Sequence, residues 1–193
     1  MINSSDPRTN IFGASDTQKM LMGLNTKGFK EFWYVKTGEI ESDFVPNKYT
    51  LAGDLLEEPV LKTIHNNMEL SPVCRYNDYL RANLDGLHND TIYEIKCCNY
   101  ESVLFTGVKK DKWYRKQVQV QMFVSGIRKA KLCYYAVMPH EYETGFLLCA
   151  EIDSDRIFTH DIEYDKEWIE EVYLPRFEFL CKCIEDNVYP WEV

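Results

Sequence analysis

Apolar residues at helical spacing predict five helices. The first begins near Ser15 or Asp16, and the other four span 26–38, 50–68, 111–126 and 164–186. Gly38 closes the second of these helices and Gly126 the fourth, since glycine readily ends a helix. Proline lacks the N–H that a helix interior needs. We therefore expect Pro59 to kink its helix or to mark a first turn, and Pro175 to interrupt the last helix.

Shorter apolar runs predict strands. The segments "RANLDG" (81–86) and "TIYEIKC" (91–97) are two strands joined by a turn, "KAKLCYYAVM" (129–138) is a third, and "SVLFTGV" (102–108) is loop or strand. The predicted elements follow the order helices, hairpin, helix, strand and final helix. This order predicts an α/β fold with a central mixed sheet flanked by helices. With 45% hydrophobic content, the 193 residues suffice for one core, so we predict a single domain over 1–193.

Two charged residues share one face of the predicted strand 91–97. Residues two apart in a strand project to the same side, so Glu94 and Lys96 point together. On a solvent-facing sheet this would be an ordinary surface pair. Asp85 lies nine residues upstream at a turn, and a hairpin can bring its carboxylate beside that of Glu94. Because two close carboxylates repel each other, such a pair normally has a cation between its members.

Oxygen ligands without soft ligands favour Mg²⁺ at such a pair, with Mn²⁺ as a substitute. A bound divalent ion lowers the pKa of a water, so that hydroxide can attack, and neutralises charge on a phosphorane. Lys96 would stabilise that charge or orient the water. The seven cysteines and four histidines show no zinc-site spacing. We expect the cysteines to be reduced.

The net charge of −9 is unevenly distributed along the chain. Residues 151–193 hold 13 acidic and 4 basic residues, and the first 150 hold the remaining 18 of each kind. Between Lys109 and Lys131 lie eight basic residues and one acid, Asp111. This window is either a solvated helix surface or a face that contacts a nucleic-acid backbone, since phosphates are bound by Lys and Arg.

The sequence shows no sign of a membrane protein. No apolar run approaches the roughly 20 residues of a membrane helix. The segment "MINSSDPRTN" lacks the charged-then-apolar pattern of a signal peptide. We therefore expect a cytoplasmic protein with no membrane partner.

Five blocks of sequence together resemble the YqaJ-type phage recombination exonucleases. The blocks are "GASD", "AGDLLEEPVL", "ANLDG", "YEIKCC" and "QVQVQMFVSG". The resemblance covers Arg8 to Gly126, and the segment "IEYDKEWIEEVYLPRFEFL" is also family-like. These enzymes are relatives of lambda exonuclease, so the resemblance implies a PD-(D/E)xK, restriction-endonuclease-like fold. A lone D…ExK pattern occurs by chance, whereas the five blocks in order are specific.

The resemblance implies roles for individual residues. The implied catalytic residues are Asp85, Glu94, Lys96 and Gln117. The implied metal ligands are Glu57, Asp85, Glu94 and the backbone carbonyl of Ile95. Glu57 stands four residues after Gly53, where the family has its acid, and the neighbouring Glu58 is the competitor for this role.

Three glutamines in the predicted helix 111–126 face different directions. Gln117 and Gln121 are four residues apart and share a helix face, whereas Gln119 is rotated by about 200° from Gln117. Gln117 and Gln121 can therefore both face the site, and Gln119 cannot. The resemblance places Gln117 beside the lysine and the attacked phosphate. Without the resemblance, the glutamines would be read as a polar helix face.

A pocket for a terminal phosphate is also implied. Lambda-type enzymes hold the 5′ phosphate with an arginine seven residues before a helix-opening serine, and Arg8 and Ser15 have that spacing. The same enzymes have a serine two residues before the metal aspartate, whereas this chain has Asn83, whose amide can still donate to phosphate. Taken alone, Arg8 is an ordinary terminal residue and Ser15 an N-cap.

The resemblance implies a Mg²⁺-dependent exonuclease that digests one strand of double-stranded DNA ends from its 5′ terminus. The remaining 3′ tail would serve a single-strand annealing protein in phage recombination inside a bacterial host. The residues expected to guide the DNA backbone are Lys109, Lys110, Lys112, Arg115 and Lys116. Related enzymes form trimeric rings, so we expect a homo-oligomer in which the acidic C-terminal third meets a basic face of a neighbour.

Two other functions stay open at this point. A structure-specific or repair endonuclease of the same superfamily would keep the metal site but would not need a 5′ phosphate. A non-catalytic DNA-binding or inhibitory protein would have a decayed nuclease site. The complete set of two acids and a lysine speaks against such decay.

Overall fold

The computed structural model describes residues 9–143 and 151–193. Its helices are α1 (Thr17–Met20), α2 (Lys27–Thr37), α3 (Lys48–Ile64), α4 (Asp111–Ser125), α6 (Lys166–Trp168) and α7 (Leu174–Glu185). Its strands are β1 (Phe12–Gly13), β2 (Glu69–Leu70), β3 (Val73–Asn77), β4 (Leu80–Asn83), β5 (Gly86–His88), β6 (Thr91–Asn99), β7 (Ala130–Val137) and β8 (Ile157–Ile162). Short 3₁₀ turns are η1 (Ala14–Asp16), η3 (Pro139–Tyr142) and η4 (Ser154–Arg156), and π-helical turns are η2 (Ser102–Thr106) and η5 (Ile169–Tyr173). The fold is mixed α/β, as predicted.

Five strands form a mixed sheet in the order β2-β5-β6-β7-β8. Strands β6 and β7 run parallel, and the other neighbours are antiparallel. Helices α4 and α3 cover opposite faces, because side chains alternate along each strand. Ile92 and Leu132 share a core with Val118 of α4. Tyr93, next to Ile92 in β6, packs instead with Leu56 of α3.

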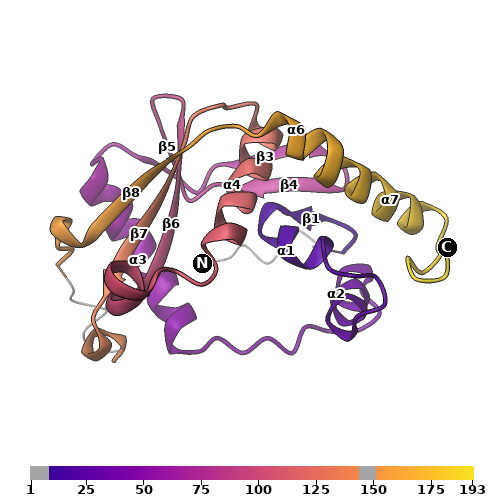
Figure 1. Cartoon of the computed structure of the whole chain (residues 1–193), viewed down its shortest axis with the longest axis horizontal. Coiled ribbons are helices and arrows are strands. Elements are labelled where there is room, and N and C mark those ends of the chain that lie inside the picture. Colours follow the sequence, from indigo (N-terminus) through magenta and orange to yellow (C-terminus); the bar gives the residue numbers. More distant parts are fainter. Residues whose placement is uncertain (1–8, 144–150) are drawn as a thin grey trace.

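Three further strands form a second, smaller sheet in the order β1-β4-β3. Helix α4 lies between the two sheets and packs against both (Figure 1). The predicted central mixed sheet is present as the five-stranded sheet, and the smaller sheet was not predicted. The predicted strand 81–86 is divided between them, because the chain leaves the small sheet after Asn83 and enters the large one at Gly86. A Cβ atom on Gly86 would lie 2.8 Å from Leu61, so glycine allows the end of α3 to pack against β5.

The structure confirms two predicted helix ends and shifts a third. Helices α2 and α4 end at Gly38 and Gly126, whose φ angles of 78° favour glycine. Helix α3 ends before His65 rather than at Met68, because the backbone of His65 is extended. Pro59 lies well inside α3, so it does not mark a first turn of that helix.

Pro175 marks a change in the type of helix near the C-terminus. Segments α6, η5 and α7 follow one another without a break from Lys166 to Glu185. Pro175 is the second residue of α7, directly after the π-helical turn η5. Because proline has no N–H, it cannot bond to the carbonyl of Glu171, and the regular α-helical pattern is interrupted there as predicted.

Several short elements were not predicted. Strand β3 is exposed at four of its five positions, so it lacks the apolar alternation by which strands are recognised. Strand β2 has only two residues, and in β8 the three consecutive residues 159–161 are polar and exposed, so neither strand has a clear alternation. The segment 102–106 is a π-helical turn, not loop or strand. The first predicted helix begins as the 3₁₀ turn η1, which contains Ser15, and continues for only four residues as α1.

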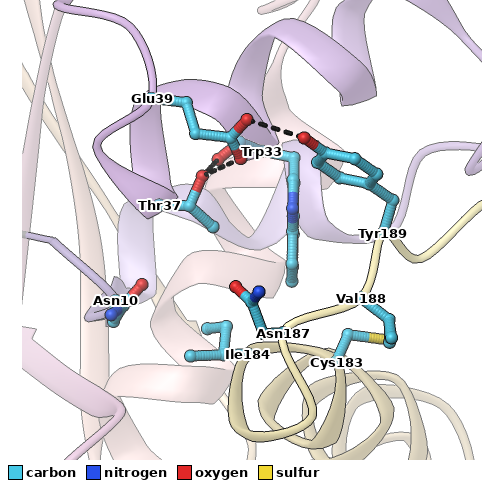
Figure 2. A pocket seen from close by; sticks show the side chains of 9 residues that line it. All are labelled: Asn10, Trp33, Thr37, Glu39, Cys183, Ile184, Asn187, Val188 and Tyr189. Atoms are coloured by element: carbon cyan, nitrogen blue, oxygen red, sulfur yellow. Dashed lines mark hydrogen bonds between the residues drawn. The ribbon is translucent and has the colours of Figure 1, made fainter.

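The residues after α7 fold back onto the end of α2. Glu39 accepts hydrogen bonds from the hydroxyl groups of Thr37 (2.8 Å) and Tyr189 (2.9 Å) at the rim of a cavity of about 430 Å³ (Figure 2). The rings of Tyr189 and Trp191 stack 4.9 Å apart. These contacts fix the C-terminal residues at the opposite end of the molecule from the β5–β6 hairpin (Figure 1). In the described ranges, no helix has the length and apolar character needed to cross a membrane, and the cysteines are free.

Candidate active site

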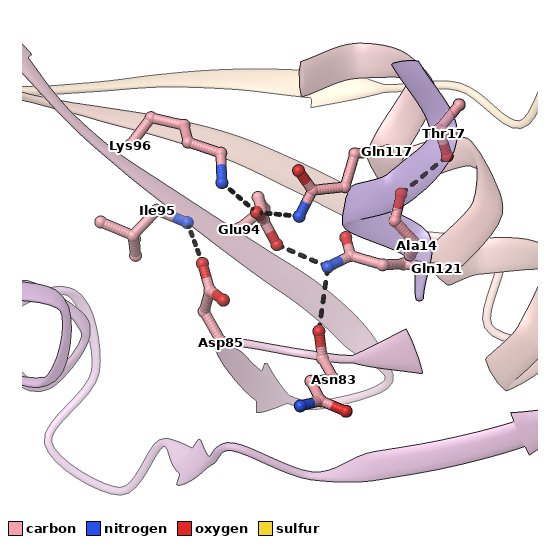
Figure 3. Close-up of polar contacts among 9 residues, drawn as sticks. All are labelled: Ala14, Thr17, Asn83, Asp85, Glu94, Ile95, Lys96, Gln117 and Gln121. Atoms are coloured by element: carbon pink, nitrogen blue, oxygen red, sulfur yellow. Dashed lines mark hydrogen bonds and ion pairs between the residues drawn. The ribbon is translucent and has the colours of Figure 1, made fainter. Parts of the chain in front are cut away.

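The hairpin β5–β6 brings Asp85 beside Glu94. Its turn residues Asn89 and Asp90 have φ angles of 48° and 54°, as a two-residue turn of this kind requires. The antiparallel register of the two strands, extended by one residue, places Asp85 opposite Glu94. The Oδ2 atom of Asp85 accepts a hydrogen bond from the backbone N–H of Ile95 at 2.7 Å (Figure 3).

The carboxylate of Glu94 is fully buried and accepts three hydrogen bonds. Its Oε1 atom accepts from Nζ of Lys96 at 2.5 Å and from Nε2 of Gln117 at 2.6 Å. Its Oε2 atom accepts from Nε2 of Gln121 at 2.5 Å (Figure 3). Glu94 is 0% exposed and the Lys96 side chain 21%. The prediction that Glu94 and Lys96 project to the same side of the strand is confirmed.

Gln119 faces away from this cluster, as helix periodicity predicts. Its Nε2 atom donates to the carbonyl of Glu163 at 2.7 Å, and its Oε1 atom accepts from the N–H of Asp165 at 2.7 Å. Gln117 and Gln121 both reach Glu94 from α4. Helix α4 therefore has one face toward the acid cluster and another toward the segment between β8 and α6.

Burial and mutual repulsion shift the pKa values of the acids upward. Burial raises the pKa of Asp85 well above its ordinary value, and repulsion from Glu94 adds to this effect. Burial and Glu94 also raise the pKa of Glu57. For Lys96, burial alone would lower the pKa, but attraction by Glu94 and Asp85 outweighs burial and raises it. Acids whose charged forms are disfavoured in this way are stabilised by added positive charge, which Lys96 supplies and a divalent ion would increase.

Of the two adjacent acids of α3, Glu57 is the one near this cluster. Burial and the charge of Glu94 raise the pKa of Glu57, and the charge of Lys96 lowers it, so its carboxyl group is within electrostatic reach of the cluster. The side chain of Glu58 is 59% exposed and forms an ion pair with Lys62 one helical turn away. Glu57 is therefore the better candidate of the two for the acid that α3 contributes.

The backbone of Ile95 lies at the same edge of β6 as Asp85. Strand β5 pairs with β6 only as far as Tyr93, so the edge of β6 beyond that residue is not covered by β5. In an extended strand, the N–H and C=O groups of one residue point to the same side. Because the Ile95 N–H donates to Asp85, the Ile95 carbonyl is directed toward the same edge.

The chemistry of these donors fits a hard divalent cation, although they are not arranged as a closed metal site. Two carboxylates, a third acid from α3 and a backbone carbonyl offer only oxygen, as Mg²⁺ prefers. Across the described residues, no group of three or more His, Cys, Asp or Glu side chains is placed to hold a metal ion. Oε1 of Glu94 already accepts from Lys96 and Gln117, whereas Oε2 accepts from Gln121, so the remaining lone pair of Oε2 is the one that could serve a metal ion.

A cavity of about 180 Å³ opens beside this cluster. Its polar lining residues are Ser15, Asp16, Lys36, Arg81, Asn83 and Gln117. The structure thus brings together Ser15 and Asn83, two of the residues predicted to bind a 5′ phosphate. The third, Arg8, lies outside the described residues. Ser15 does not act as a helix cap, because it lies inside η1, and the N-cap residues of η1 and α1 are Gly13 and Asp16.

An ion pair between Lys36 and Asp16 at this cavity was not predicted. Nζ of Lys36 lies 2.6 Å from Oδ2 of Asp16 and also donates to the carbonyl of Ile11 at 2.8 Å. Lys36 belongs to the last turn of α2 and Asp16 to η1, so only the packing of these elements brings them together. No local spacing in the sequence signals this contact.

The predicted DNA-guiding residues fall into two groups. Arg115 pairs with Asp111 at 2.7 Å, and Lys116 pairs with Asp165 at 3.3 Å. The other three, Lys109, Lys110 and Lys112, are exposed. Asp165 belongs to the acidic C-terminal part of the chain, so some of that acidity is used within the same molecule.

Two solved structures are similar over most of the chain. The alkaline exonuclease LHK-Exo from Laribacter hongkongensis covers 93% of this chain and 90% of its own, with a TM-score of 0.67 and 19% sequence identity. A phage-related exonuclease from Haemophilus somnus 129PT covers 92% of this chain and 94% of its own, with a TM-score of 0.63 and 19% identity. The chain therefore shares the fold of these two exonucleases.

The similarity to exonucleases is found by comparing structures, not by comparing the sequence with family models or curated proteins. No family model and no curated protein matches the sequence. A second structure of LHK-Exo, in complex with dAMP, matches 93% of this chain with a TM-score of 0.66 at 19% identity. The likeness therefore lies in the arrangement of helices and strands, and the roles of individual residues rest on the geometry of this chain.

Proposed function

We propose that this protein is a metal-dependent exonuclease that acts on the ends of double-stranded DNA. The observation that carries the proposal is the fully buried Glu94 carboxylate, with Lys96 at 2.5 Å and Asp85 on the adjoining strand end, in an exonuclease fold. A buried charge pair beside a further buried acid is costly to maintain for structure alone. Carboxylates and an amine are the groups that metal-assisted phosphodiester hydrolysis requires.

The proposed metal ligands are Asp85, Glu94, Glu57 and the carbonyl of Ile95, holding Mg²⁺ or, as a substitute, Mn²⁺. The ion, when bound, supplies an acidified water and neutralises charge at the phosphate. Lys96, kept protonated by Glu94 and Asp85, donates to a phosphate oxygen of the scissile group. Gln117 contacts Glu94 and also lines the adjoining cavity, so its amide orients the substrate between the two.

The adjoining cavity is proposed to hold a terminal 5′ phosphate. The hydroxyl of Ser15 and the amide of Asn83 supply neutral donors, and Arg81 adds a cationic side chain to the lining. Arg8 is proposed as a further contact. A 5′ terminus held next to Gln117 places the first phosphodiester bonds of that strand at the acid cluster, which gives 5′-to-3′ digestion and leaves a 3′ tail.

The wider setting follows from this polarity. The exposed residues Lys109, Lys110 and Lys112 are proposed to guide the DNA backbone, with smaller contributions from Arg115 and Lys116, whose charges are paired. We propose a homo-oligomer, as a trimeric ring, in the cytoplasm of a bacterial host. A single-strand annealing protein would take up the 3′ tail in phage-type recombination.

The test uses linear duplex DNA labelled at either the 5′ or the 3′ end, incubated with and without Mg²⁺. The proposal predicts early release of the 5′ label as mononucleotide, slow loss of the 3′ label, no digestion without a divalent ion, and survival of closed circular duplex. Cleavage of the circle would indicate an endonuclease instead. Binding of the duplex without digestion under any metal condition would indicate a non-catalytic DNA-binding protein.

A second experiment tests the phosphate cavity. Removing the 5′ phosphate from the duplex should slow the start of digestion. The Ser15→Ala variant should reduce the difference between phosphorylated and unphosphorylated ends, because one donor to the phosphate is removed. Thr17, two residues further along, is 1% exposed, and its hydroxyl donates to the carbonyl of Ala14. Thr17→Ser is therefore a control in the same segment that should leave the difference between phosphorylated and unphosphorylated ends unchanged. Equal rates on both kinds of end by the wild type would contradict the assignment of this cavity.

A further inference from the structure

We propose that Gln121 is a positioning residue that fixes the Glu94 carboxylate relative to the segment leading to Asp85. This inference rests on the proposed function, because it gives Gln121 the task of orienting two proposed metal ligands. Gln121 is distinct in this from Gln117, which lines the cavity and faces the substrate.

One amide group of Gln121 joins two strands from different sheets. Its Nε2 atom donates to Oε2 of Glu94 at 2.5 Å and to the backbone carbonyl of Asn83 at 3.2 Å (Figure 3). Glu94 lies in β6 of the large sheet, and Asn83 is the last residue of β4 in the small sheet. Asp85 follows Asn83 by two residues. A side-chain amide has two N–H groups, so both contacts can be made at once.

The contact determines how the Glu94 carboxylate is turned. Its Oε1 atom accepts from Lys96 and Gln117, whereas Oε2 has Gln121 as its donor among the described residues. Without the Gln121 N–H, the carboxylate could rotate about its last side-chain bond and leave a buried oxygen without a donor. Anchoring Oε2 therefore fixes the plane of the carboxylate that the metal and Lys96 would share.

Burial separates this role from a contact with DNA. Gln121 and Glu94 are both 0% exposed. A fully buried side chain cannot touch a substrate strand, so any effect of Gln121 on catalysis must pass through the residues that it holds.

Packing alone does not account for a glutamine at this position. The Oε1 atom of Gln121 is buried and has no hydrogen-bond partner among the residues that the structure describes. An unsatisfied buried acceptor destabilises the folded protein, and an apolar side chain of similar volume would avoid this cost. The two bonds made by Nε2 are the contribution that such an apolar side chain could not replace.

The test compares Gln121→Met with Gln119→Met. Gln119 is 5% exposed, lies on the same helix and makes two hydrogen bonds of 2.7 Å, but these go to Glu163 and Asp165. The measurements are the affinity for Mn²⁺ in the absence of DNA, and kcat and KM on linear duplex. Loss of a residue that orients a metal ligand typically lowers metal affinity or activity by about 10- to 100-fold. We expect this loss in Mn²⁺ affinity and kcat for Gln121→Met, with KM unchanged, and no such loss for Gln119→Met.

Three results would overturn the assignment of Gln121. These are a folded Gln121→Met protein with wild-type Mn²⁺ affinity, a rise in KM without a change in kcat, and equal losses in the two variants, which would indicate a general packing effect. If Gln121→Met does not fold, Gln121→Asn keeps an amide but is one methylene too short to reach both acceptors, and the same losses are expected. A wild type that neither binds Mn²⁺ nor digests duplex would instead contradict the proposed function itself.

Discussion

Two lysine–carboxylate pairs on either side of α4 differ in burial, and therefore in the energetic cost of breaking them. Lys96 and Glu94 are 2.5 Å apart, and Glu94 is 0% exposed. Lys116 and Asp165 are 3.3 Å apart, and the side chain of Asp165 is 46% exposed. Breaking a buried pair leaves a charge without compensation and costs about 3–5 kcal/mol, whereas an exposed pair contributes about 0–1 kcal/mol.

The exposed pair contributes to packing at the surface, whereas the buried pair belongs to the cluster that we propose as the active site. Lys116 also lies 3.9 Å from the ring centroid of Trp168, so its pairing helps to fix α4 against the C-terminal helices. Lys96 has a different environment, because Glu94 and Asp85 are mutually repelling acids that both act on it. The buried charge of Lys96 is stable only beside the negative charges of Glu94 and Asp85. The same two carboxylates are the ones that we propose as metal ligands.

The largest expected effect comes from Lys96→Met. The buried Glu94 would lose its counter-ion, so the free energy of unfolding should fall by about 3–5 kcal/mol. DNA cleavage should fall by about 10²- to 10³-fold, because the variant has no donor to the reacting phosphate at this position. Mn²⁺ affinity should be retained or increased, since a competing cation has been removed. Urea unfolding with and without Mn²⁺, together with cleavage rates, would measure all three.

Lys116→Met is the matched control for this variant. It breaks the exposed pair and should change the unfolding free energy by no more than about 1 kcal/mol. Any loss of cleavage should be small and arise from weaker DNA binding, because the donor proposed for the reacting phosphate is still present. Loss of Mn²⁺ binding in Lys96→Met, or similar destabilisation by the two substitutions, would contradict the distinction between the two pairs.

A third pair, between Arg156 and Glu141, should give an intermediate and pH-dependent effect. Arg156 donates to both carboxylate oxygens of Glu141, at 2.7 and 3.0 Å, and the two side chains are 15% and 16% exposed. Burial alone would raise the pKa of Glu141, but these bonds and the N–H of Met138 outweigh burial and lower it. The pair therefore stabilises the fold above the unfolded pKa, and this contribution disappears as the pH falls through the lower folded pKa.

Glu141→Gln would measure that contribution. At neutral pH the variant should be less stable than the wild type by about 1–3 kcal/mol. The difference should shrink as the pH is lowered through the acidic range in which Glu141 of the folded wild type takes up a proton. A difference that stays constant down to acidic pH would show that the lowered pKa of Glu141 is not the source of the stabilisation.

The smallest expected effects concern the basic residues near the start of α4. The double variant Lys109→Ala/Lys110→Ala should weaken duplex binding and reduce the salt dependence of affinity by about one unit of slope for each phosphate that a lysine no longer neutralises. Arg115→Ala/Lys116→Ala should change the slope less, because these cations are already paired with acids. A larger slope change for Arg115→Ala/Lys116→Ala would show that DNA displaces the acidic partners.

Features that depend on neighbours within one element were predictable from sequence. Strand alternation predicted that Glu94 and Lys96 share a face, and helix periodicity predicted that Gln117 and Gln121 face the site while Gln119 does not. Such predictions succeed because the geometry of a strand or helix fixes the direction of each side chain.

Features that depend on packing between distant segments were not predictable. Lys36 meets Asp16 only because α2 packs beside η1, and Lys116 meets Asp165 across 49 residues of sequence. The basic residues of the segment 109–131 therefore have more acidic partners in the folded protein than their sequence neighbours suggest. Likewise, the strand predicted over 81–86 could not be divided correctly without knowing that two sheets meet there.

The most direct test of the account is digestion of linear duplex DNA by the wild type and by Asp85→Asn, with and without Mg²⁺. The asparagine is isosteric and its side-chain oxygen can still accept from the Ile95 N–H, so the hairpin should fold normally. The account predicts Mg²⁺-dependent release of nucleotides by the wild type, and DNA binding without digestion by the variant. Digestion by Asp85→Asn at the wild-type rate, or digestion by the wild type in the presence of a chelator, would contradict it.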